Sequence, residues 1–155
     1  GIGIRQANFK DHDVALNIGA DGCYYLLSFT RLAKYDRAGM LVYNLELPCD
    51  HTWGRACGDA SGNAFVLCSG SGEDRFILRV SLTGDDVRVH IPYVAEGGGV
   101  CHEEALALSA NGTLVAAGYG GRLRTFSAEG KLIYASAASR ADEEEVMRKV
   151  RDAEV

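Results

Sequence analysis

The stretch that decides the fold reads Ser109-Ala-Asn-Gly-Thr-Leu-Val-Ala-Ala-Gly-Tyr-Gly-Gly-Arg-Leu-Arg-Thr-Phe-Ser-Ala-Glu-Gly-Lys-Leu-Ile-Tyr134. It contains a turn glycine, an apolar segment, a glycine-rich loop, a mixed segment and a second turn glycine. Asn-Gly between two apolar segments is a strong hairpin signal, because the tight turn needs residues that accept a positive φ. The stretch therefore predicts successive antiparallel strands joined by short turns.

The same layout occurs three times, over Val14–Pro48, Trp53–Pro92 and Glu104–Ser136. The first turn glycines are Gly22, Gly62 and Gly112, and the second turn glycines are Gly39, Gly84 and Gly130. We expect second strands over Cys23–Leu27, Ala64–Cys68 and Thr113–Ala117. The third strands are expected to end at Tyr35, Val80 and Phe126. The fourth strands are expected over Leu41–Leu47, Val87–Ile91 and Leu132–Ala135. Repeats of this length with four strands each are typical of β-propeller blades. The alternative is a β-sandwich with accidental self-similarity.

The third repeat resembles NHL-type propeller repeats, in which a turn glycine, an apolar strand, a glycine-rich loop, an Arg-hydrophobic pair and a second turn glycine follow one another. The first repeat, with Arg31-Leu-Ala-Lys-Tyr-Asp-Arg-Ala-Gly39, looks similar. The resemblance implies an all-β fold of three four-stranded antiparallel blades and says little about function. The Trp-Asp dipeptide of WD repeats is absent from the sequence.

Composition narrows the classes of function. The chain of 155 residues suits one domain and has 19 Gly but only 2 Pro, as expected for many tight turns. Its net charge of −5 and the lack of a basic stripe argue against nucleic-acid binding. The longest apolar run, Ala64–Cys68, is too short to span a membrane. Five cysteines without a CxxC pair favour a reducing, cytoplasmic location.

Two segments lie outside the repeats. Residues 139–155 are rich in helix formers, and their charge changes from acidic to basic, so we expect a helical tail after a three-bladed unit over residues 1–138. Residues 4–9 could add a strand to a blade.

Three histidines share one repeat position. His12 and His102 lie ten residues before a first turn glycine, and His51 lies eleven before its own. Together they could bind a divalent metal, as in propeller-type hydrolases or lactonases. The competing interpretation is that each histidine fixes its own blade, and repetition favours it. The predicted innermost strands offer Asn17 and Arg55 as their only interior polar residues, which argues against an enzyme and leaves no cofactor implied.

The loops at one end of the blades form the expected binding surface. Arg31, Trp53, Tyr93 and Tyr119 are the candidate ligand-binding residues, because aromatic and arginine side chains dominate binding interfaces. For each, packing between blades is the alternative. We therefore expect a binding or scaffold module for a protein or a small ligand.

Three blades cannot close a ring alone, because closed propellers have about 4 to 8 blades. An open arc would leave two apolar blade faces in water, which drives association. We expect either self-association or incorporation into a longer propeller.

Overall fold

The structure is a computed structural model that describes residues 14–71, 75–92, 103–118, 122–136, 148, 151 and 152. Its twelve strands form three four-stranded antiparallel sheets, each of which follows the order of the chain. The predicted all-β fold of three four-stranded blades is therefore confirmed.

Each predicted repeat forms one sheet. The first blade consists of β1 (Val14–Ile18), β2 (Tyr24–Ser28), β3 (Arg31–Tyr35) and β4 (Leu41–Glu46). The second blade consists of β5 (His51–Gly58), β6 (Ala64–Ser69), β7 (Arg75–Val80) and β8 (Val87–Ile91). The third blade consists of β9 (Glu103–Leu108), β10 (Leu114–Gly118), β11 (Leu123–Phe126) and β12 (Leu132–Ala135). The largest difference from the expected bounds is that β5 begins two residues earlier, at His51.

The turns lie where the glycine pattern placed them. All six predicted turn glycines have a positive φ, between 81° and 90°. In the first turn of the first blade, the Gly22 N–H donates to the Gly19 carbonyl at 2.9 Å. A side chain at this φ would be strained, so glycine is the residue that the turn requires.

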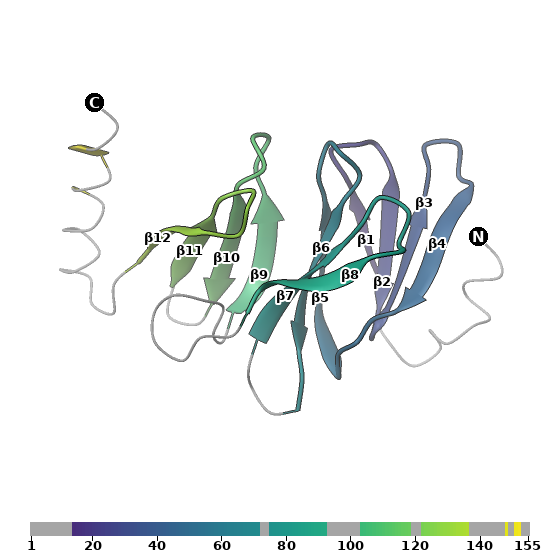
Figure 1. Cartoon of the computed structure of the whole chain (residues 1–155), viewed down its shortest axis with the longest axis horizontal. Helices are drawn as coiled ribbons and strands as arrows, with labels where there is room; N and C mark the ends of the chain where they lie inside the picture. The colour runs from purple at the N-terminus through teal and green to yellow at the C-terminus, as the bar shows by residue number, and fades with distance from the viewer. Residues whose placement is uncertain are drawn as a thin grey trace.

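The three blades lie side by side in chain order (Figure 1). Their first strands are neighbours, since β5 contacts both β1 and β9. This arrangement, with the first strand of each blade at the centre, is that of a β-propeller.

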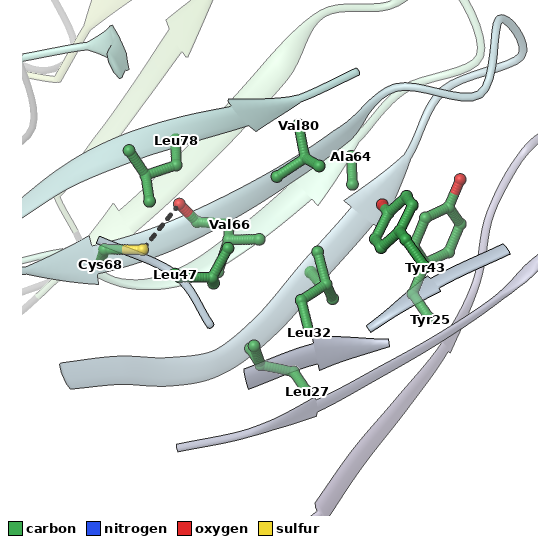
Figure 2. Close-up of a cluster of buried hydrophobic side chains, with 11 residues drawn as sticks. Tyr25, Leu27, Leu32, Tyr43, Leu47, Ala64, Val66, Cys68, Leu78 and Val80 are labelled. Carbon is green, nitrogen blue, oxygen red and sulfur yellow. Dashed lines mark hydrogen bonds between the residues drawn. The ribbon is translucent and has the colours of Figure 1, made fainter. Parts of the chain in front are cut away.

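One hydrophobic core lies between the first two blades. Figure 2 shows Leu27, Leu32 and Tyr43 of the first blade facing Val66 and Val80 of the second. All five side chains are at most 6% exposed. The Cys68 thiol, in the same core, donates to the Val66 carbonyl at 3.5 Å.

A second core joins the second blade to the third. Phe65, Leu67 and Ile77 lie on the opposite face of the middle sheet and pack with Leu106 and Phe126 of the third blade. The middle blade is thus covered on both faces, and every residue of β6 is buried.

Unlike β6, the second strands of the outer blades are not buried along their whole length. Tyr24 of β2 is 37% exposed, and Val115 of β10 is half-buried. The physical reason is that each outer blade has a neighbour on one side only among the described residues.

Arg148, Arg151 and Asp152 of the tail are helical, and Arg148 lies 3.5 Å from Asp152 in an i,i+4 ion pair. The rest of residues 139–155, like residues 4–9, lies outside the described residues, so the tail helix stays a prediction. In the described parts of the chain, no helix is long and apolar enough to cross a membrane.

Candidate functional site

Four side chains from three parts of the first two blades meet at one end of the molecule, and we call them the loop-face cluster. They are Phe29, His51, Trp53 and Arg75. Phe29 lies in the turn between β2 and β3, His51 and Trp53 lie at the start of β5, and Arg75 begins β7. The β2–β3 turn and the starts of β5 and β7 therefore lie at the same end of the two blades.

Phe29 occupies an unusual backbone conformation. Its φ of 54° is positive, and no other non-glycine residue in the described ranges has a positive φ. The hairpin requires this, because Ser28 pairs directly with Arg31 and leaves a two-residue loop. A side chain in this region costs about 1–2 kcal/mol. The Phe29 ring is nevertheless 46% exposed.

The rings of the cluster stack edge to face. His51 lies 4.5 Å from Trp53 and 6.1 Å from Phe29, measured between ring centroids. The Arg75 guanidinium lies over the Trp53 ring, 3.8 Å from its centroid, in a cation–π contact. Phe29 and His51 are exposed, whereas Arg75 is only 6% exposed. The aromatic side chains of the cluster are therefore accessible to solvent, and its cation is buried.

Trp53 has two roles in this arrangement. Its ring packs against the core between the second and third blades, as the packing alternative expected. The same ring also makes the contacts with His51 and Arg75. The buried indole N–H finds no hydrogen-bond acceptor among the described residues.

One hydrogen bond ties the cluster together across the two blades, and a second one fixes the start of β5 within its own blade. The Thr52 hydroxyl donates to the Phe29 carbonyl, and the Asp50 N–H donates to the Ser69 carbonyl at 2.9 Å. The strained turn of the first blade is thereby tied to the first strand of the second.

The structure places Arg31 apart from the stack on Trp53. Its guanidinium donates to Asn44 at 3.2 Å and lies 3.3 Å from the Glu46 carboxylate, so it is engaged by β4 of its own blade. Tyr93 and Tyr119 lie outside the described residues. The assignment of these three residues and Trp53 to ligand binding therefore stays a prediction.

The metal hypothesis also stays a prediction. Of His12, His51 and His102, the structure describes only His51, whose imidazole takes part in the ring contacts above. Within the described ranges, no group of three His, Cys, Asp or Glu side chains could hold a metal ion.

The four described cysteines are free thiols. Burial raises the pKa of the Cys57 thiol to about 11, so this thiol stays protonated at neutral pH. Hydrogen bonding with the neighbouring Cys68 thiol lowers the pKa of Cys49. Cys68 is buried and Cys57 is partly buried, so both thiols pack as small hydrophobic side chains.

Sequence reasoning missed Arg75 as the cation of the cluster. The repeat pattern of the sequence places Arg31 in a loop at the binding end and so favours it, but in the structure Arg31 and Arg75 each begin a strand, β3 and β7. The available signal was that Arg75 directly follows the loop between the second and third strands of its repeat, two residues before Ile77, which matches an apolar position of the other repeats.

Comparisons with known proteins show the fold alone. No protein-family model and no curated protein matches the sequence. A protein of unknown function from Bacteroides caccae is similar in structure, with a TM-score of 0.53 and 16% identity over 84% of this chain and 47% of that chain. Regucalcin from Agrobacterium tumefaciens, a calcium-binding protein, gives a TM-score of 0.53 and 14% identity over 79% of this chain and 43% of that chain. The chain thus spans less than half the length of either solved structure.

Proposed function

We propose that the chain is a β-propeller module that binds a protein or a small ligand through its loop face. The observation that carries this proposal is Phe29, a large apolar residue that stays 46% exposed at the cost of backbone strain. Strained residues persist where surrounding structure enforces them and are concentrated at binding and active sites. A purely structural hairpin would place glycine here.

The neighbouring side chains fit a binding role. Phe29 and His51 offer exposed aromatic surface, and Arg75 and Trp53 beneath them are fixed by stacking and packing. Rigid aromatic anchors bind at a low cost in conformational entropy. Arg31, Tyr93 and Tyr119 are kept as further candidate ligand-binding residues of this proposal.

A substitution at Phe29 separates binding from folding. Peptides are selected from a phage-displayed random library on the wild-type chain, and their affinities are measured through the fluorescence of Trp53, the sole tryptophan. Phe29→Gly should weaken these peptides at least tenfold, about 1.4 kcal/mol. It should not lower the free energy of unfolding, since glycine accepts the positive φ.

Met40→Ala is the matched control, because Met40 is an apolar residue 66% exposed in another turn. It should leave peptide affinity unchanged. Selected peptides that bind Phe29→Gly as tightly as the wild type would contradict the proposal, as would a library from which no peptide and no small molecule changes the Trp53 emission.

A further inference from the structure

The first and last blades each leave one sheet face without a described neighbour. A comparison of the exposure of equivalent residues in the three blades shows this. Six residues before the first turn glycine stand Leu16, Ala56 and Leu106, which are 61%, 1% and 6% exposed. Ala56 packs in the core with the first blade, and Leu106 packs in the core with the second. Leu16 occupies the equivalent position in the first blade. It lies on the face of that blade that has no described blade in front of it.

On the open face of the first blade, one row of paired residues is apolar across all four strands, whereas the row of Val14, Ser28, Arg31 and Glu46 is polar and charged on its outer strands. Directly paired residues lie on one face of a sheet. One such row across the sheet consists of Ile18, Tyr24, Tyr35 and Leu41. Ile18 is 70% exposed and Leu41 is 55% exposed. Large apolar side chains that are exposed together on one face are typical of an interaction site.

The third blade has the complementary open face. Three residues after the first turn glycine stand Tyr25, Phe65 and Val115. Tyr25 and Phe65 are 0% and 4% exposed, because each packs on the following blade, whereas Val115 is half-buried. The rows on this open face are Ala107, Val115, Thr125 and Tyr134, and Ala105, Ala117 and Leu123.

The two open faces differ in the size of their side chains. Between the first two blades, large Tyr25 fits against Gly58, where an added Cβ would lie 2.4 Å from its ring. Sheets pack best where large side chains meet small ones. The open face of the first blade presents large Leu16 and Ile18 on its inner strand. The open face of the third blade presents Ala105 and Ala107 on its inner strand. Its inner strand thus has small side chains where that of the first blade has large ones.

We propose that the open face of the first blade packs on the open face of the third blade of a second copy of this chain. Because each copy carries both faces, the contact forms twice around a two-fold axis and closes a ring of six blades. A six-bladed ring lies within the usual range of about 4 to 8 blades.

Sedimentation equilibrium of the full 155-residue chain at micromolar concentration tests this pairing. The wild type should have twice the 16.6 kDa mass of one chain. Leu16→Glu blocks the face of the first blade and Ala107→Glu blocks the face of the third. Each variant alone should be monomeric, because both contacts in its ring would bury an unpaired carboxylate. Both positions are exposed in one chain, so each variant should keep the wild-type circular dichroism.

Mixing the two variants gives the decisive result. One variant retains Ala107 and the other retains Leu16, so a mixed pair has one intact contact, and the mixture should recover dimer that neither variant forms alone. Val89→Glu is the matched control, since Val89 is 53% exposed on β8 of the covered middle blade, and it should remain dimeric.

Three outcomes would overturn the proposal. A wild-type monomer would do so. If that monomer also binds a hydrophobic dye through Leu16, the face is exposed in this chain and would be covered by other blades instead of by a second copy. A dimer that survives in Ala107→Glu would mean that like faces pair. An open, growing assembly would mean that the contact does not close. None of these outcomes depends on the Phe29 substitution, which leaves the blade faces untouched.

Discussion

At the scale of single residues, a buried lysine joins the first two blades. Lys34 is 1% exposed, and its ammonium donates to the carbonyls of Gly62 at 2.9 Å and Leu82 at 3.1 Å, both in the second blade. Its counter-charge is Asp21, 3.6 Å away in the first blade. A buried cation must have such partners, because leaving it unpaired costs several kcal/mol.

Asp21→Asn should therefore lower the free energy of unfolding by about 3–5 kcal/mol, the usual cost of breaking a buried pair on one side. The double variant Asp21→Asn with Lys34→Met should recover most of that loss, since neither charge remains. Urea unfolding measures both. A single variant as stable as the wild type would show that the two carbonyls alone satisfy Lys34.

The same pair predicts a dependence on pH. Burial raises the pKa of the Asp21 carboxyl, but hydrogen bonds from the Cys23 N–H and the Tyr25 hydroxyl, with the charge of Lys34, lower it below 3.8 overall. A group with a lowered folded pKa adds stability that is fully present above its unfolded pKa and is lost as the pH falls through the folded value. Stability of the wild type should fall more steeply below about pH 4 than that of the double variant, as measured by urea unfolding at several pH values.

At the scale of elements, the close contact between β2 and β5 requires glycine, because a larger residue would collide with Tyr25. A Cβ on Gly58 would lie 2.4 Å from the Tyr25 ring, and a Cβ on Gly19 would lie 2.7 Å from it. The Ala20 N–H also donates to the Gly58 carbonyl at 2.9 Å, so the two blades meet here through their backbones. β2 and β5 cannot easily move apart to accommodate a larger side chain, because protein cores are closely packed.

Gly58→Ala should lower the free energy of unfolding by about 1–3 kcal/mol, as overpacking does. Gly70→Ala is the control, because a Cβ there lies 3.9 Å from its nearest neighbour, Phe76, and neither glycine needs a positive φ. The control should change stability by less than about 0.5 kcal/mol. Equal effects of the two substitutions in urea unfolding would show that Tyr25 does not confine β5.

At the scale of the whole molecule, the two open blade faces govern how the chain behaves in solution. If a second copy covers them, unfolding is linked to dissociation, and the melting temperature rises with protein concentration. A tenfold increase contributes about 1.4 kcal/mol per dimer, which corresponds to roughly 1–3 °C for proteins of this size. Calorimetry should show this rise for the wild type and none for Leu16→Glu. A melting temperature independent of concentration in both would contradict a dimer held by these faces.

The local pattern of the sequence determined the blades themselves. Turn glycines such as Gly22 and Gly62 specify where each hairpin reverses, because only residues that accept a positive φ fit there, and the apolar segments between them specify the strands. For the same reason the loops that carry Phe29, His51 and Trp53 could be assigned to one end of the molecule before any coordinates. The strands alternate in direction, so alternate connections must lie at the same end.

Only the tertiary structure decided which side chains meet between blades. Leu16, Ala56 and Leu106 occupy equivalent positions in the sequence, yet their exposure depends on whether another blade lies in front of them. The pairing of Lys34 with Asp21 and the stacking of Arg75 on Trp53 likewise join residues that no local pattern relates. Such contacts depend on the rotation and spacing of one sheet against the next, which arise from packing of the whole arc rather than from any single repeat.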